Sequence, residues 1–266
     1  MIIIKDLVIL KILAVGDVVG DSGSNFLRQH LSNLKKERNI DFIIANGENS
    51  DHGNGITRRS TSFLFESGVD VITTGNHAFR RYEALKLFDE EKYLIRPANY
   101  PNGTTPGNGM CIMDNGKHKI CVINVMGLTY LDSLGCPFRT MDKLLRSVTE
   151  TNIIIVDFHA EATAEKRCLG FYLDGRVSAV FGTHTHVPTA DEDILPKGTG
   201  YITDLGMTGV IHSSLGVKPE IAIRRMKNKL PVKFEFAEGK CKMDCVLFDI
   251  DETTGKAISI ERISIK

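Results

Sequence analysis

The sequence has no excess of charge of either sign and no tryptophan. Lys and Arg together number 33, as do Asp and Glu, so the formal net charge is zero. Proteins that bind nucleic acid or anionic membranes usually carry a basic excess or a cluster of basic residues. No run of five Lys or Arg residues occurs here, so the composition gives no strong nucleic-acid signal. A small phosphorylated substrate is still compatible with it, because a metal site can supply positive charge locally.

Long apolar segments and a dense set of cysteines are also missing. Lys5, Asp6 and Lys11 interrupt the apolar N-terminus, which falls short of the ~20 apolar residues that span a bilayer. We predict no membrane partner and interpret residues 1–9 as a leader before the first strand. The six cysteines are scattered along the chain rather than concentrated in a disulfide framework. That pattern favours a reducing compartment, and we expect a cytoplasmic protein.

Short β-branched runs alternate with helical patterns, which is typical of parallel βαβ units and predicts an α/β fold. The first part of the chain predicts strands at 10–15, 42–45 and 69–73, and helices at 24–38, around Phe63 and Leu64, and at 82–88. Further strands are predicted at 120–125, 153–156, 177–181 and 201–203. Period-2 patterns predict antiparallel strands that finish a second sheet at 232–236, 243–248 and 257–265. We interpret residues 10–266 as a single domain.

Polar side chains of the kinds that bind metal ions follow five of the predicted strands. In chain order they are Asp17, Glu48, Asn49, Asn76, His77, His159, His184 and His186. The carboxyl ends of parallel strands share one edge of a sheet, where ligands bind in open α/β folds. Taken singly, most of these residues are at least as typical of turns, helix caps or solvated surface. Their recurrence favours a shared site, because four of the chain's eight histidines are among them.

Seven of these side chains have the chemistry of a two-metal site: Asp17, Glu48, Asn49, Asn76, His159, His184 and His186. Carboxylate, amide oxygen and imidazole ligands suit Mn²⁺, Fe²⁺ or Zn²⁺, and the absence of cysteine from the set argues against structural zinc. Seven donors are too many for one tetrahedral ion but fit two ions that share a bridging carboxylate. Two metals roughly 3.5–4 Å apart can clamp the attacking and leaving oxygens of a displacement at phosphorus.

Glycine-containing motifs carry most of these candidates: Gly16-Asp17, Gly47-Glu48-Asn49, Gly75-Asn76-His77 and Gly182-Thr183-His184-Thr185-His186. With the lone His159 between the third and fourth, their order resembles that of the calcineurin-like metallophosphoesterases. Longer segments are similar, almost residue for residue, to the bacterial YmdB family of phosphodiesterases. They lie at 46–49, 157–163, 182–187 with 189–192, and 203–209. This resemblance runs from about residue 10 to the C-terminus. It implies a four-layer αββα sandwich of the metallophosphoesterase type and a dinuclear centre of iron or manganese, with zinc as an alternative.

The resemblance also implies a role for each residue. One ion would be held by Asp17, Asn49 and His186, and the other by Asn76, His159 and His184, with Glu48 as the bridge. His77 resembles the catalytic acid of the family. The wider group usually bridges with Asp and has an acidic residue after Asn-His, where this chain has Ala78. The narrower family tends to show Ile-Trp-Asp there, whereas this chain reads Ala78-Phe79-Arg80.

Arg80 and Arg81 follow the Asn-His motif directly. They could add positive charge near a phosphate, but exposed arginines at the start of a helix are the more ordinary interpretation.

Three functions are compatible with these residues. The leading one, with the cyclic-nucleotide substrate and the role of His77 implied by the resemblance, is a phosphodiesterase. It would hydrolyse 2′,3′- or 3′,5′-cyclic nucleotides or related phosphodiesters through a metal-bound hydroxide, with His77 expected to protonate the leaving oxygen. The second is a nucleotide phosphomonoesterase with the same centre. The third is a metal-holding regulatory protein whose partner surface matters more than its turnover. The expected partner is a small phosphorylated substrate, and the sequence leaves a homo-oligomer open.

Overall fold

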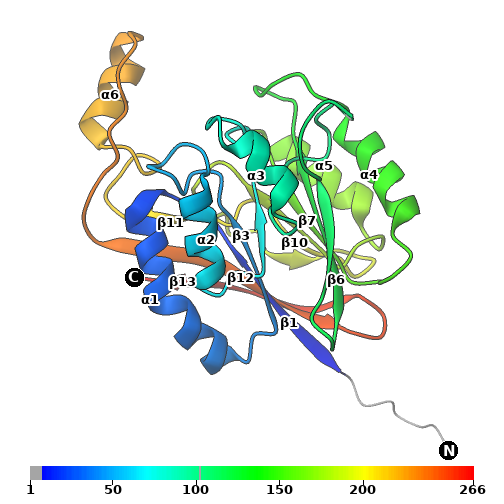
Figure 1. Ribbon diagram of the computed structural model, residues 1–266. Coiled ribbons are helices and arrows are strands. Elements are labelled where there is room, and N and C mark those ends of the chain that lie inside the picture. Colours follow the sequence, from blue (N-terminus) through cyan, green and yellow to red (C-terminus); the bar gives the residue numbers. More distant parts are fainter. Residues whose placement is uncertain (1–7, 102) are drawn as a thin grey trace, which may run out of the picture.

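The computed structural model describes residues 8–101 and 103–266, and two mixed β-sheets form its centre (Figure 1). The first sheet has seven strands in the order β2-β11-β12-β1-β3-β4, and β13 also pairs with β12. Their bounds are β1 (Ile9–Val15), β2 (Asp17–Val18), β3 (Phe42–Asn46), β4 (Val71–Thr73), β11 (Met207–Val210), β12 (Cys241–Asp251) and β13 (Ala257–Ile265). Within it, β1, β3 and β4 run parallel, while β12 is antiparallel to its three neighbours.

The second sheet has six strands in the order β5-β6-β7-β8-β10-β9. Their bounds are β5 (Met110–Asp114), β6 (Lys119–Met126), β7 (Ile154–His159), β8 (Ala179–Thr183), β9 (Asp193–Ile194) and β10 (Gly200–Ile202). The four central strands are parallel, and both edge strands are antiparallel. The helices are α1 (Gly20–Arg38), α2 (Arg58–Glu66), α3 (Ala84–Glu90), α4 (Pro137–Ser147), α5 (Thr163–Leu173) and α6 (Pro219–Asn228).

Alternation along the strands divides the core into separate apolar clusters. On β1, Leu13 packs in a cluster with Leu27 and Leu31 of α1, whereas its neighbour Ile12 packs with Val122 of the second sheet. A third cluster joins the other face of the second sheet to helices α4 and α5. Because successive side chains point to opposite faces of a strand, each sheet buries both of its faces. This double burial explains why these strands are almost continuously apolar.

The carboxyl ends of the parallel strands come together at one edge of the two sheets. From the first sheet, β1, β3 and β4 end just before Asp17, Glu48 and Asn76. From the second sheet, β7 ends at His159 and β8 ends just before His184. The structure therefore confirms the predicted βαβ organisation for the parallel strands that lead into the site.

The C-terminal part of the chain differs from the sequence prediction. The strands at 243–248 and 257–265 exist, but they join the first sheet, because β12 pairs along the whole length of β1. The predicted strand at 232–236 is wrong. Among residues 8–101 and 103–266, this segment pairs with no strand and forms only a single bridge, between Val217 and Phe236, as it returns from α6.

Helix prediction from the sequence was incomplete. The first helix starts at Gly20 rather than residue 24, and Val19 occupies the N-cap without a side-chain hydrogen bond. Helices α4, α5 and α6 were not predicted. Helix α6 has no buried residue and projects from the body of the molecule (Figure 1), so no core-facing pattern marks it.

Most of the predicted leader, residues 1–7, lies outside the described residues. Its last residue is already in a strand, because β1 begins at Ile9. None of the helices in residues 8–101 and 103–266 combines the length and the apolar composition that a membrane-spanning helix needs.

Gly182 provides a test of how closely the strands approach at the site edge. A Cβ placed there would lie 1.8 Å from the carbonyl oxygen of Thr203, which is backbone and cannot swing away. We expect Gly182→Ala to lower the free energy of unfolding by about 3 kcal/mol, at the upper end of overpacking effects. Urea unfolding measures this. Gly209→Ala is the control, since its Cβ would approach Val19 only to 3.3 Å. Equal stability of the two variants would contradict the close approach.

Candidate metal centre

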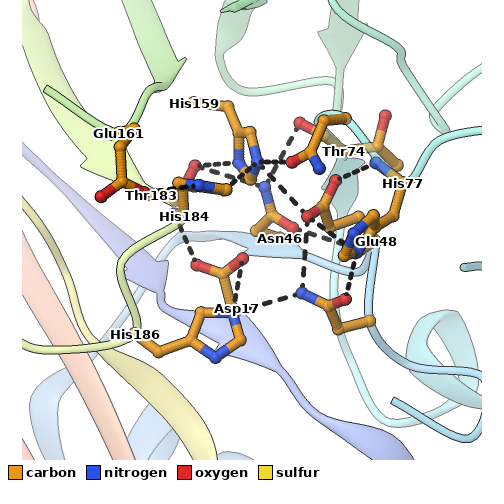
Figure 2. A network of polar contacts seen from close by, with 12 residues as sticks. Asp17, Asn46, Glu48, Thr74, His77, His159, Glu161, Thr183, His184 and His186 are labelled. Carbon is orange, nitrogen blue, oxygen red and sulfur yellow. Dashed lines mark hydrogen bonds and ion pairs between the residues drawn. The ribbon is translucent and has the colours of Figure 1, made fainter. Parts of the chain in front are cut away.

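A first group of ligand atoms surrounds the ring nitrogen Nε2 of His159, which is fully buried at the end of β7 (Figure 2). Asn76 Oδ1 lies 2.9 Å from this nitrogen, His184 Nδ1 lies 3.1 Å away, and Glu48 Oε1 lies 3.3 Å away. Four segments from both sheets therefore point lone-pair atoms at one small volume. Glu48, His159 and His184 have the spacing of a group that could hold a metal ion.

A second group lies beside the first, around Nε2 of His186. Asn49 Nδ2 lies 3.2 Å from this nitrogen, and Asp17 Oδ1 lies 3.5 Å from it. Asp17 also contacts the first group, because its Oδ2 accepts a hydrogen bond of 3.1 Å from the backbone N–H of His184. Asp17 and His186 are both buried.

Glu48 lies between the two groups. Its Oε1 is 3.3 Å from His159 Nε2 and 3.4 Å from Asn49 Nδ2, so one oxygen faces a member of each group. Its Oε2 accepts a 2.8 Å hydrogen bond from the backbone N–H of His77. The structure thus brings all seven predicted ligands together and puts the proposed bridge in the middle.

Each of the three predicted histidine ligands has its other ring nitrogen occupied by the protein. His159 Nδ1 lies 2.9 Å from the Thr183 hydroxyl, His184 Nε2 lies 2.9 Å from a carboxylate oxygen of Glu161, and His186 Nδ1 lies 3.1 Å from the backbone oxygen of Leu215. Such contacts fix the orientation of a metal-binding imidazole and leave one nitrogen free for the ion.

The loop that carries His184 and His186 is held in an uncommon conformation. Both residues have positive φ, at 101° and 62°, which a residue with a side chain adopts only when its surroundings enforce it. Asp204 supplies part of that enforcement, since its Oδ2 accepts from the N–H of Thr185 and from Lys166 Nζ, at 3.1 and 2.7 Å. The ion pair is buried, so the loop is anchored to α5 by a contact that water does not weaken.

The electrostatics of the site favour positive charge. Burial opposes ionisation of Asp17 and Glu48, yet His186 and His159 beside them hold the pKa of each carboxyl below its usual range. Burial would lower the pKa of His159, but Glu48 raises it to about 9. Burial and the neighbouring His159 lower the pKa of His184 to about 4. Two buried carboxylates therefore attract cationic charge, which a pair of metal dications would supply.

The donor set fits such ions in most respects. Asp17 Oδ1 is buried and accepts no hydrogen bond within the described part of the chain, which leaves an oxygen lone pair aimed at His186. Carboxylate, amide and imidazole donors without cysteine suit transition metals. Asn49 needs a local change, because its Nδ2 faces Glu48 and His186 while its Oδ1 faces His77. A half-turn of that amide would present oxygen to an ion.

His77 lies at the edge of the site rather than among the ligands. Its Nδ1 is 2.7 Å from Asn49 Oδ1, and its side chain is 28% exposed. Asn49 therefore orients the His77 ring. The residue after His77 is Ala78, which has no polar group that could do so. Burial lowers the pKa of His77, with Arg80 and His159 acting in the same direction against Glu48.

The two arginines after His77 have different surroundings. Arg81 pairs with Asp51 at 2.8 Å and donates to the backbone oxygen of that residue, so it ties two loops together. Arg80 is exposed and makes no ion pair with any residue that the structure describes.

A buried carboxylate beneath the site was missed by sequence reasoning. Asp157 accepts hydrogen bonds from the hydroxyls of Thr73 and Thr183 and from the amide of Asn46. Thr183 in turn contacts His159, so a chain of hydrogen bonds runs from Asp157 to a candidate ligand. The only sequence signal was a polar residue in the apolar strand Ile154–His159, two positions before the histidine.

The chain is similar in sequence and in fold to several known proteins. Residues 13–263 match the family model described as "YmdB-like protein". A 2′,3′-cyclic-nucleotide 2′-phosphodiesterase of Bacillus subtilis is 48% identical over 257 residues, which cover 96% of this chain and 97% of that protein. The crystal structure of a phosphatase from Mycoplasma pneumoniae has a TM-score of 0.91 at 36% identity, covering 97% of this chain and 94% of the other. The NAD nucleotidase of Haemophilus influenzae shares the fold, with a TM-score of 0.59 at 13% identity over 97% of this chain and 56% of that one.

The hydrogen bond from Thr183 to His159 predicts a selective effect on metal binding. Thr183→Val removes the partner of His159 Nδ1 and should weaken binding of one ion by roughly 10- to 100-fold. Thr183→Ser keeps the hydroxyl and should retain affinity. Thr73→Val is the matched control, because it removes another hydrogen bond to Asp157 without touching a ligand. Metal content after dialysis against graded chelator measures the effect, and equal losses in the two valine variants would reduce Thr183 to a purely structural role.

Proposed function

The chain belongs to the YmdB-like family, and on that premise we propose that it is a metal-dependent phosphodiesterase that hydrolyses cyclic nucleotides. The observation that carries the proposal is the convergence of seven donor side chains into two adjacent groups, with the Glu48 carboxylate between them. We further propose that the two sheets and their covering helices form the four-layer αββα sandwich of metallophosphoesterases. Within this class we favour 2′,3′-cyclic nucleotides, the substrates named for the Bacillus subtilis relative.

Two ions of iron or manganese, with zinc as an alternative, are the proposed cofactors. Asn76, His159 and His184 would hold one of them and Asp17, Asn49 and His186 the other. Glu48 would contact both. When bound, such ions supply positive charge to the phosphate and lower the pKa of the attacking water.

The chain's own residues would position and protonate the substrate. The first ligand group lies at the floor of the site, and His77 lies at its edge, where the departing oxygen of a bound phosphodiester would be. With the Asn49 amide turned to present its oxygen to an ion, its Nδ2 would donate to His77 Nδ1, which leaves the ring proton on Nε2 for that departing oxygen. The negative charges of the buried Asp17 and Glu48 would retain the ions when the negatively charged substrate binds.

A cytoplasmic location is part of the proposal. All six cysteines are free, and four of them are buried. Burial raises the pKa of Cys111 and of Cys121 to about 12, so these thiols are unreactive packing groups. A chain that keeps six unpaired cysteines suits a reducing compartment.

Glu48 provides a test of the bridge. Glu48→Gln removes a negative charge from between two dications, and we expect both ions to be lost together, along with activity. His159→Ala should mainly release one ion. Metal analysis of protein purified without oxygen measures the stoichiometry, with two ions per chain expected in the unaltered enzyme. Retention of both metals and of near-normal turnover in Glu48→Gln would disprove the bridge.

His77 provides a test of the proton donor. In His77→Ala, hydrolysis of 2′,3′-cyclic AMP should slow by roughly 10²–10⁴-fold, because a ribose alkoxide is a poor leaving group. Hydrolysis of bis-p-nitrophenyl phosphate should slow far less, because p-nitrophenolate leaves without a proton. The measurement is kcat/KM for both substrates at unchanged metal content. A comparable loss on both would assign His77 to charge stabilisation instead, and no loss on either would leave it a turn residue.

A further inference from the structure

A cavity of about 480 Å³ lies between the loop after Leu94 on one side and α4 with the segment that leads into it on the other. Ala98 and Tyr100 line it on one side, and Leu134 and Leu144 line it on the other. Ser133, Thr140 and Lys143 add polar groups to the same cavity. Its size falls within the range of pockets that bind small organic ligands, and its lining mixes apolar surface with a few polar groups, as such pockets do.

The cavity is connected to the catalytic edge through two aromatic rings. Phe79 lies two residues after His77, and its ring meets the ring of Tyr100 edge-on, with centroids 5.4 Å apart and planes at 80°. Phe79 is itself held by Phe88 of α3, at 5.1 Å between centroids. The turn that carries His77 therefore rests against the ring that lines the cavity.

The position of Tyr100 is fixed by the residue before it. Asn99 donates to the backbone oxygens of Met126 and Gly135, at 2.8 and 3.0 Å, and accepts from the N–H of Met126 at 2.9 Å. The backbone oxygen of Asn99 accepts from the N–H of Gly135 at 2.9 Å. These bonds clamp the two walls of the cavity together, so that it is preformed rather than dependent on a loop closing.

The backbone places Tyr100 near the metal centre. Asn99, the residue before it, is hydrogen-bonded to Met126, and Met126 pairs with the candidate ligand His159 across β6 and β7. The hydroxyls of Ser133 and Thr140 and the ammonium of Lys143 have no hydrogen-bond or ion-pair partner in residues 8–101 and 103–266, so they are available to a ligand.

We propose that this cavity receives the base of a cyclic nucleotide, with the ring of Tyr100 as the surface on which the base stacks. The inference rests on the proposed phosphodiesterase function and names the part of the substrate that the metal centre does not contact. A base on Tyr100 extends from the leaving-group side of the phosphate, which is the side of His77. Stacking accepts any base, because every base has a π-face, so the site selects nucleotides over simpler phosphodiesters more than one base over another.

Two cyclic phosphodiesters test the proposal: 2′,3′-cyclic AMP, and glycerol 1,2-cyclic phosphate, which has a similar five-membered ring but no base. The unaltered enzyme should have a higher kcat/KM for the nucleotide. Tyr100→Ala should lower kcat/KM for the nucleotide by roughly 5- to 100-fold, mainly through KM, and leave the glycerol compound nearly unchanged. Tyr100→Phe keeps the stacking surface and should retain the preference. Tyr82→Ala is the matched control, because Tyr82 is 89% exposed and does not line the cavity.

A direct binding measurement that includes a second variant, Lys143→Ala, covers the case in which Tyr100→Ala folds poorly. The fluorescence of 2-aminopurine riboside 3′-monophosphate should be quenched on binding to the unaltered enzyme and to Tyr100→Phe, and not in the presence of Tyr100→Ala. Lys143→Ala, at the cavity rim, should weaken that binding without altering metal content. If both cyclic compounds are hydrolysed and Tyr100→Ala affects them equally or not at all, the base subsite is overturned while the phosphodiesterase function stands. If neither is hydrolysed, the proposed function itself fails.

Discussion

The burial of two carboxylates at the junction of two sheets is the constraint on which this site depends. Asp17 and Glu48 are withdrawn from water, and an isolated buried carboxylate would take up a proton rather than stay charged. Here they remain ionised because histidines from the second sheet and from the loop after it lie within 3.5 Å of them. The two sheets are thus joined at this edge by charge as well as by apolar contact. The same arrangement keeps two negative charges at the candidate site, which favours cations there.

Close backbone approach is what allows so many ligands to meet. Gly75 precedes Asn76, and a Cβ on it would lie 2.2 Å from the ring of His159. Gly16 precedes Asp17, and its Cβ would lie 2.3 Å from the backbone oxygen of Gly206. Each glycine therefore makes room for a neighbouring strand or ligand, and the ligand follows one position later. The glycine-containing motifs in the sequence reflect this crowding.

The candidate ligands could be predicted from the sequence because each stands at the end of an apolar run, where parallel strands share an edge. The orienting groups could not, because nothing local marks them. Asp157 is a single polar residue inside an apolar strand, and its hydrogen-bond partner Asn46 is 111 residues away in the other sheet. Glu161 was visible as part of a motif, but its contact with His184 depends on where a loop of positive φ places that ring. The membership of β12 in the first sheet was equally hidden, since period-2 alternation reveals a strand but not its neighbour.

The pairing of β12 has a consequence for the order of events on the ribosome. All seven candidate ligands have been synthesised by residue 186, yet β1, which leads into Asp17, is completed by a strand that begins at Cys241. Asp244 reaches back across this pairing, and its backbone oxygen accepts from the N–H of Gly16. Contacts of such long sequence separation form late and slowly. The nascent chain therefore carries all seven candidate ligands before it has the strand that completes their sheet. A metal centre built from them would assemble only after β12 has left the exit tunnel.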